Sequence, residues 1–226
     1  MATFSPQIQA VLCDMDGTLS DTEVFWQQAE RRIIAEYGDP TLRPEATDQS
    51  IGISMEASAA LLRDQYGVTL EIGQLMQLAV DYALEAMSGE ITWMPGILSL
   101  LDEAETAGIP RALVTSSPGR VARAIVAELP GQTFDVIISG DDVSSHKPEP
   151  APYLHAAQAL GADPRHCVAF EDSVPGVLSA LAAGCLVVGA SSIGAAFEAH
   201  ERLIVRPSLE GLSLRDIADA ARTAGD

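Results

Sequence analysis

The hydrophobic pattern of the chain predicts strands that are buried on both faces. Residues 8–13 form an almost unbroken apolar run that ends shortly before Gly17. Runs of this kind are typical of parallel sheets, whose strands are covered on both sides. Comparable short runs recur along the second part of the chain. They predict further strands at 111–114, 134–138, 167–170, 186–188 and 202–205.

Between these runs, apolar residues recur at helical spacing, and proline and glycine mark the expected helix ends. Pro95 and Gly96 open the first of these helices and Gly108 closes it. Strands that alternate with helices predict an α/β fold with a Rossmann-like parallel sheet and right-handed crossovers. The later helices are expected at 118–128, at 150–160, at 174–183, in a short segment near 194–200, and at 212–222.

Residues 22–91 have a different pattern, because helical periodicity continues there without a strand-like run. The expected helices follow Thr22 as far as Gly38, and then cover about 54–66 and about 71–88. The sequence therefore predicts two domains. Residues 1–21 and 92–226 form an α/β core domain, and residues 22–91 form an inserted all-helical domain.

The composition is that of a chain that folds on its own. It has 226 residues, of which 47% are hydrophobic, so it can bury a sizeable core. We expect a monomer. No apolar stretch reaches the length of a membrane helix, and the N-terminus lacks the pattern of a secretion signal. We therefore expect a cytoplasmic protein. Cys13, Cys167 and Cys185 lie in apolar runs and are expected to be small buried hydrophobes.

The formal charge of −19 excludes nucleic acid and anionic membranes as expected partners, because no basic patch could meet their phosphates. An acidic protein that binds a phosphorylated small molecule must concentrate positive charge locally. The basic residues comprise twelve arginines and one lysine, Lys147. This usage favours a position that needs a compact ammonium group, with chance as the alternative.

Asp14 and Asp16 directly follow the first predicted strand. Together with Gly17 they place acidic oxygens at the carboxyl edge of the sheet, where open α/β sheets bind their ligands. An acidic turn without function is the alternative, since aspartate and glycine favour turns for local reasons.

Polar residues follow three more predicted strands. Thr115 and Ser116 come after the second strand, where they could cap a helix or bind an anion at its N-terminus. Lys147 lies on a proline-braced loop, from which it could reach a cleft or point into solvent. Glu171 and Asp172 are adjacent carboxylates that repel each other unless a cation meets them, which favours a metal over a solvated pair.

Taken together, these clusters resemble the four motifs of the haloacid dehalogenase (HAD) superfamily. Their order and spacing match across nearly the whole chain. The inserted helices resemble the type 1 cap domain of the branch that contains phosphoglycolate phosphatase and β-phosphoglucomutase. The matching residues are Asp14, Asp16, Gly17 and Thr18 for the first motif, Thr115 for the second, Lys147 and Pro148 for the third, and Glu171 and Asp172 for the fourth.

The resemblance implies a Mg²⁺-dependent phosphatase that hydrolyses a small phosphomonoester, either a sugar phosphate or a phosphoglycolate-like metabolite, through an aspartyl-phosphate intermediate. It makes Asp14 the nucleophile, Asp16 the acid and base, and Lys147 the third catalytic residue. It assigns phosphoryl binding to Gly17, Thr18, Thr115, Ser116 and Lys147. It assigns Mg²⁺ binding to Asp14, Asp16, Glu171 and Asp172.

Departures from related patterns separate the alternatives. β-Phosphoglucomutases use a cap histidine where this chain has Trp26, and a cap arginine where it has Met55. The cap contains no lysine, which disfavours phosphonatase chemistry, and haloacid dehalogenases lack the second aspartate, here Asp16. Phospho-accepting receiver modules use similar residues with Mg²⁺, but in a different order and without an insert. The sequence leaves the identity of the phosphomonoester open.

Overall fold

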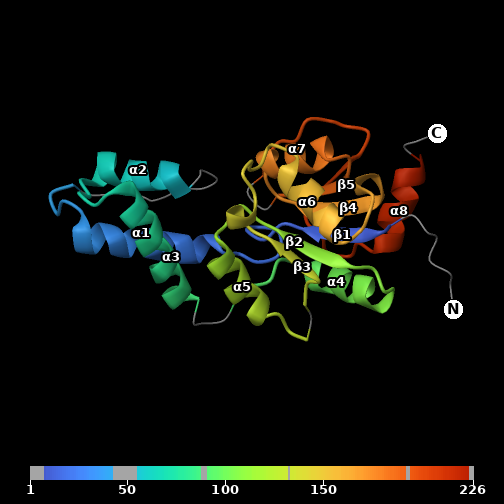
Figure 1. The fold of residues 1–226 in the computed structure, drawn as a ribbon, viewed down its shortest axis with the longest axis horizontal. Helices are drawn as coiled ribbons and strands as arrows, with labels where there is room; N and C mark the ends of the chain where they lie inside the picture. The colour runs from blue at the N-terminus through green and yellow to red at the C-terminus, as the bar shows by residue number, and fades with distance from the viewer. Residues whose placement is uncertain (1–7, 43–54, 88–90, 132, 192–193, 224–226) are drawn as a thin grey trace. The chain divides into compact units, whose positions relative to one another are not determined.

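The computed structural model describes residues 8–42, 55–87, 91–131, 133–191 and 194–223. The chain divides into two compact units, Met1–Asp21 with Thr92–Asp226, and Thr22–Ile91 (Figure 1). Among the helices in the described ranges, none has both the length and the apolar character that crossing a membrane requires.

The first unit contains a six-stranded sheet in the order β3-β2-β1-β4-β5-β6, and all neighbouring strands are parallel. This confirms the predicted parallel α/β core. The strands are β1 (Ala10–Cys13), β2 (Arg111–Val114), β3 (Val136–Ile138), β4 (Cys167–Glu171), β5 (Leu186–Ala190) and β6 (Leu203–Arg206).

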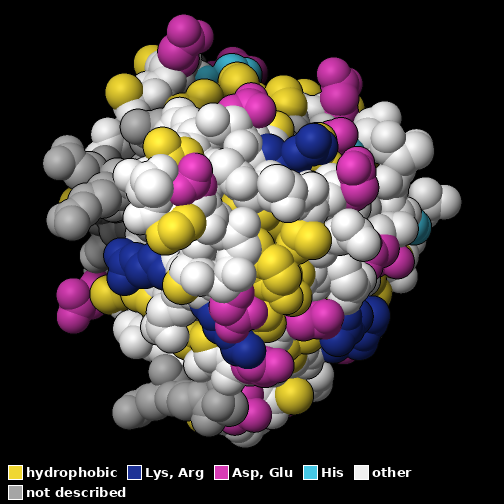
Figure 2. Space-filling model, turned by 90° about the vertical axis from the view of Figure 1, so that its left-hand side faces the viewer, with side chains coloured by type: hydrophobic (Ala, Val, Ile, Leu, Met, Phe, Trp, Pro, Cys, Tyr) yellow, Lys and Arg dark blue, Asp and Glu magenta, His cyan; other side chains and the backbone are white. Residues whose placement is uncertain are grey.

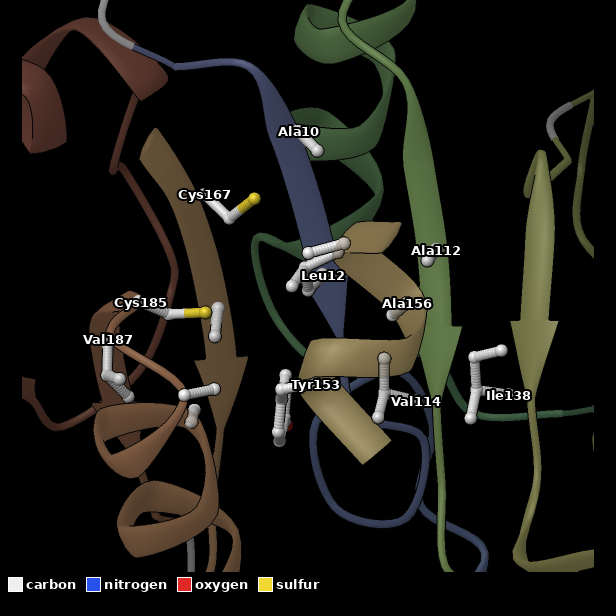
Figure 3. Close-up of a cluster of buried hydrophobic side chains, with 14 of the residues drawn as sticks. Ala10, Leu12, Ala112, Val114, Ile138, Tyr153, Ala156, Cys167, Cys185 and Val187 are labelled. Carbon is white, nitrogen blue, oxygen red and sulfur yellow. The ribbon is translucent and has the colours of Figure 1, made fainter. Parts of the chain in front are cut away.

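Helices cover both faces of the sheet, which explains why the central strands β1, β2 and β4 are mostly apolar. Figure 1 shows α6 and α7 on one side and α4 and α5 on the other. On the side of α6 and α7, Leu12, Ala112 and Ala169 share one core cluster with Tyr153 (Figure 3). Successive side chains of a strand point to opposite faces, and all four residues of β1 are buried. The helices of this unit are α4 (Ile97–Thr106), α5 (Gly119–Ala127), α6 (Ala151–Ala159), α7 (Val174–Ala182) and α8 (Leu214–Thr223), with short 3-10 helices η2 (Gly140–Asp142) and η3 (Pro164–His166).

The short helix predicted near 194–200 is wrong, because the structure has no helix over these residues. Gly194 has a positive φ of 74°, which lies outside helical geometry. Farther along, the Phe197 ring packs over Gly189 of β5, where a Cβ atom would lie 3.0 Å from the ring. The apolar residues of this segment therefore cover the sheet from an irregular chain.

Two segments connect the first unit with the second, and within the first unit they pair with each other. The Asp21 N–H donates to the Thr92 carbonyl at 2.9 Å, and the Met94 N–H donates to the Leu19 carbonyl at 3.0 Å. Ser20 and Trp93 form an antiparallel bridge between these bonds. The chain therefore leaves and re-enters the first unit at one hydrogen-bonded ribbon.

The second unit contains α1 (Glu23–Tyr37), α2 (Met55–Tyr66) and α3 (Ile72–Ala86), and its described residues form no strand. Buried apolar side chains such as Ile33 and Leu75 form its core. Arg32 of α1 lies over the Tyr82 ring of α3 at 3.6 Å from the centroid, and the Tyr82 hydroxyl donates to Glu36 at 2.5 Å. On the face drawn in Figure 2, acidic side chains are interspersed with arginines and hydrophobic side chains.

Candidate active site

The carboxyl ends of three neighbouring strands bring the predicted site residues together within the first unit. Asp14 directly follows β1, Thr115 directly follows β2, and Glu171 is the last residue of β4. β1 pairs with both β2 and β4, so these positions lie side by side. Lys147 comes from the loop between η2 and α6 and reaches the same edge.

Lys147 lies between two carboxylates in a buried environment. Its Nζ donates to Asp14 Oδ1 at 2.5 Å, to Glu171 Oε1 at 2.7 Å and to the Val114 carbonyl at 3.0 Å. The side chains of Lys147, Asp14 and Glu171 are only 6%, 8% and 0% exposed. The three N–H donors of the ammonium are thus all used by the protein.

The cluster contains three carboxylates, of Asp14, Glu171 and Asp172, and one ammonium group, of Lys147. Burial and, after it, this excess of carboxylates shift the pKa values of the site. Burial raises the pKa of Asp14 well above its usual range, and Glu171 and Asp172 add to the rise while Lys147 opposes it. Burial, with the Glu171 charge second, raises the pKa of Asp172 to about 7. Burial alone would lower the pKa of Lys147, but Asp14 and Glu171 outweigh it and raise that pKa. The site therefore lacks positive charge.

The donor set fits a hard divalent cation. One carboxylate oxygen from each of Asp14, Glu171 and Asp172 lies within 4.8 Å of the others, and carboxylate oxygens are the ligands such ions prefer. Gly17 makes room for this arrangement: its φ is +82°, and a Cβ atom there would lie 2.2 Å from Asp172 Oδ2. The residues present can thus hold a metal ion.

Glu171 is held by four donors, two on each oxygen. Oε1 accepts from Lys147 Nζ at 2.7 Å and from the Tyr153 hydroxyl at 2.6 Å. Oε2 accepts from the Ser173 hydroxyl at 3.2 Å and from the Asp172 N–H at 3.3 Å. A carboxylate has about four acceptor positions, so in this conformation the protein occupies those of Glu171. The predicted role of Glu171 as a metal ligand stays a prediction, and it requires one of these donors to be displaced. Burial raises the pKa of Tyr153 well above its usual range, so its hydroxyl remains a donor.

Gly176 makes room for Glu171 from the other side. A Cβ atom on Gly176 would lie 1.9 Å from Glu171 Oε2, so only glycine allows the carboxylate to lie against α7. The N-terminus of α7 is capped by Ser173, whose hydroxyl accepts from the Gly176 N–H at 3.1 Å. The same serine therefore caps the helix and orients the carboxylate.

Asp16 is held by two hydroxyl groups that follow β2. Its Oδ2 accepts from Thr115 Oγ1 at 3.1 Å and from Ser117 Oγ at 2.8 Å. The Ser117 N–H in turn donates to Thr115 Oγ1 at 2.9 Å. The sequence analysis missed Ser117. It named Ser116 instead, whose side chain is exposed and whose expected contact with a phosphoryl oxygen is through its backbone N–H. The available signal was the run of three hydroxyl residues after the strand.

Two other predicted residues lie in the loop that follows β1. The Gly17 N–H donates to the Ser20 carbonyl at 2.9 Å, so in this conformation it is used within the loop. Thr18 is 3% exposed, and its hydroxyl has no hydrogen-bond partner among the described residues. The structure thus brings Asp14, Lys147, Glu171 and Asp172 together directly, and places Gly17 and Thr18 beside them in the chain.

This combination is that of enzymes with a Rossmann-like parallel sheet in which an aspartate follows the first strand and a hydroxyl, a lysine and an acidic pair come from the neighbouring strand ends and loops. The chain belongs to the haloacid dehalogenase-like hydrolases, whose family model matches residues 11–190. It is therefore an enzyme of the family that its motifs resemble.

The chain is similar to several known proteins. It is 42% identical over 220 residues to hexitol phosphatase A of Escherichia coli (strain K12), covering 90% of this chain and 92% of the relative. It is 30% identical over 192 residues to protein CbbY of Rhodobacter capsulatus, and the match covers 80% of this chain and 85% of CbbY. The crystal structure of a CbbY variant from Rhodobacter sphaeroides in complex with xylulose-1,5-bisphosphate superposes on this chain with a TM-score of 0.79 and 29% sequence identity. The match covers 93% of this chain and 99% of the CbbY chain. A hexitol phosphatase and CbbY proteins thus resemble this chain along most of its length.

Proposed function

We propose that this protein is a Mg²⁺-dependent phosphatase that hydrolyses a small phosphomonoester through an aspartyl-phosphate on Asp14. The observation that carries the proposal is the buried cluster in which Lys147 Nζ lies 2.5 Å from Asp14 Oδ1, beside two further carboxylates. Such a site combines a nucleophile, a cation and a place for a metal ion. The names of the relatives, hexitol phosphatase and phosphorylated carbohydrates phosphatase, favour a sugar phosphate as the substrate.

Charge repulsion is the main obstacle to the first step. One negative charge on Asp14 against two on a phosphate at ~4 Å costs roughly 8 kcal/mol at an effective dielectric of about 20. Lys147 offsets part of this cost by donating to the phosphoryl oxygens. Mg²⁺ held by Asp14, Asp172 and the main-chain carbonyl of Asp16 would supply the remaining positive charge. Glu171, whose acceptor positions are filled, would act by orienting Lys147.

The chemistry then follows in two displacements. An Asp14 carboxylate oxygen attacks the phosphorus atom, the bond to the substrate oxygen breaks, and Asp16 donates its proton to the departing alcohol. Asp16 next takes a proton from a water molecule that attacks the phosphorus atom, which releases inorganic phosphate and restores Asp14. Thr115 and Ser116 would hold phosphoryl oxygens during both steps.

The second unit, Thr22–Ile91, would act as a cap domain that excludes water and selects the leaving group. The support for this role is the place of the insertion, directly after the β1 loop that carries Asp14 and Asp16. Cap side chains that contact the substrate would then distinguish one phosphomonoester from another.

The test is phosphate release from a panel of hexitol phosphates, sugar phosphates and phosphoglycolate, with Mg²⁺ and with a chelator. Asp14→Asn serves as the inactive variant, and Asp102→Asn, at an exposed position on α4, as the matched control. We expect Mg²⁺-dependent release that Asp14→Asn abolishes and Asp102→Asn retains. Equal release by Asp14→Asn would refute the nucleophile, and no release from any compound would refute the substrate class.

A further inference from the structure

Tyr153 is a core residue with one polar atom directed at the site. It lies on α6, is fully buried, and belongs to the apolar cluster on that face of the sheet. Figure 3 shows it beside the carboxyl ends of β1 and β4. Its hydroxyl donates to Glu171 Oε1 at 2.6 Å, and its ring centroid lies 5.3 Å from Lys147 Nζ. One side chain therefore contacts both members of the Lys147 and Glu171 pair.

Packing alone does not account for the hydroxyl. Phenylalanine would fill the same volume without a polar atom, and a buried hydroxyl costs free energy unless it finds a partner. In this structure the partner is an oxygen that also accepts from Lys147. The hydroxyl and the ammonium thus share one acceptor atom.

When a substrate binds, the hydrogen bonds to this shared atom, Glu171 Oε1, must change. All three N–H donors of Lys147 are used by Asp14, Glu171 and Val114. Lys147 must redirect a donor in order to reach a phosphoryl oxygen. If Glu171 depended on Lys147 alone at Oε1, that redirection would leave a buried carboxylate oxygen without a partner, which is costly.

We propose that the Tyr153 hydroxyl is a positioning group that holds Glu171 in place and so frees Lys147 to bind the substrate phosphoryl group. The inference rests on the proposed phosphatase function. Tyr153 touches neither substrate nor metal in this scheme, and it acts through Glu171. Removing its hydroxyl ties Lys147 more firmly to Glu171 and weakens the contact of Lys147 with the transferred group.

The first test is kinetic. Tyr153→Phe keeps the ring and removes only the hydroxyl, and we expect kcat to fall about tenfold with a smaller change in KM, because a hydrogen bond to a charged group is lost. In a Glu171→Gln background the same substitution should change kcat by less than about twofold, since residues that act through one another are not additive. Tyr82→Phe is the control, because it removes a tyrosine–glutamate hydrogen bond in the second unit.

The second test does not require turnover. Lys147 is the single lysine of the chain, so protein grown on ¹³C,¹⁵N-lysine gives one set of side-chain NMR signals, all from this residue. Tyr153→Phe should shift the Lys147 ammonium signal and alter its exchange with water, and Tyr82→Phe should leave it unchanged. This readout reports on the Lys147 environment whether or not a substrate has been found.

The outcomes are distinct. Two results together support the inference. Tyr153→Phe shifts the Lys147 signal, and it lowers kcat in the wild-type background but not in the Glu171→Gln background. An unchanged Lys147 signal overturns it, whatever the kinetics, because the hydroxyl would then not act on Lys147. A kcat loss of equal size in the Glu171→Gln background also overturns it. A shifted signal in a protein that hydrolyses no phosphomonoester supports the link from Tyr153 to Lys147 and refutes the phosphatase function instead.

Discussion

Replacing Gly176 with alanine would add a single carbon atom against the Glu171 carboxylate. The new Cβ would lie 1.9 Å from Oε2 and 2.0 Å from both Cδ and Oε1. Ordinary contact begins at 3.4 Å, so the atoms must separate by about 1.5 Å. Helix propensity works in the opposite direction, because alanine is favoured over glycine in a helix by about 1 kcal/mol. Whether Gly176→Ala raises or lowers the free energy of unfolding therefore depends on which contacts the Glu171 carboxylate loses.

Glu171 cannot move without breaking its ion pair with Lys147. Separating a buried ion pair costs about 3–5 kcal/mol, and after the gain in helix propensity we expect Gly176→Ala to lower the free energy of unfolding by about 3 kcal/mol. For a chain of this size that corresponds to a fall of about 6–12 °C in Tm. Phosphatase activity should fall with it, because Lys147 loses its orientation.

Differential scanning calorimetry of Gly176→Ala measures this change. Gly73→Ala is the matched control, because Gly73 also lies in the first turn of a helix, α3, but a Cβ atom there would meet nothing within 4 Å. Its Tm should rise slightly. In the double variant Gly176→Ala with Glu171→Asp, the shorter side chain should recover part of the lost Tm. A Gly176→Ala protein as stable and as active as wild type would refute the reasoning.

Three further predictions concern the site. Because the folded-state pKa of Asp172 is raised to about 7, its contribution to stability is fully present below its unfolded pKa and lost as pH rises through 7. The Tm of chelator-treated protein should thus fall between about pH 4, near the unfolded pKa of 3.8, and about pH 7. The increase in Tm caused by Mg²⁺ should grow over the same range in a thermal-shift assay, and an increase independent of pH would contradict this. Ser117→Ala should lower kcat about tenfold with little change in KM, because Asp16 loses the hydroxyl at 2.8 Å. Steady-state kinetics should show activity close to wild type for Ser117→Thr, which keeps the hydroxyl. Ser116→Ala is the control, because it removes an exposed hydroxyl and keeps the N–H, and it should show no loss. Equal losses in Ser117→Ala and Ser116→Ala would argue against a specific contact of Ser117. Lys147→Arg should lower kcat at least about 100-fold, because a planar guanidinium cannot donate to three acceptors from the position of one nitrogen. Activity close to wild type would show that only the charge at this position matters.

The sequence predicts the sheet well because its central strands are covered on both faces. β1 is apolar throughout for that reason, and β2 is apolar after Arg111, so their limits need no knowledge of tertiary contacts. The clustering of Asp14, Lys147 and Glu171 also follows from the sequence, since the carboxyl ends of parallel strands meet at one edge. Their roles in catalysis and metal binding remain predictions that the experiments above address.

What the sequence cannot predict depends on contacts between distant residues. Tyr153 has the pattern of an ordinary core aromatic on a helix, and its hydroxyl gains meaning only from Glu171, which comes from a different element. Ser117 differs from Ser116 only in the direction its side chain takes after β2. Phe197 lies in an apolar segment whose pattern predicts a helix. Its ring instead packs over Gly189, which has no side chain, and the sequence does not show this contact.

The segments that enter and leave the second unit pair with each other in one ribbon, so the second unit could be exchanged for another segment. Asp21 and Thr92 are hydrogen-bonded neighbours, so any segment whose own ends lie side by side can be spliced between them without stretching the sheet. The cluster of Asp14, Lys147, Glu171 and Asp172 lies entirely outside the spliced segment. If the second unit selects the substrate as proposed, helical inserts from related hydrolases grafted at this junction should change the substrate preference and leave the Lys147 cluster unchanged.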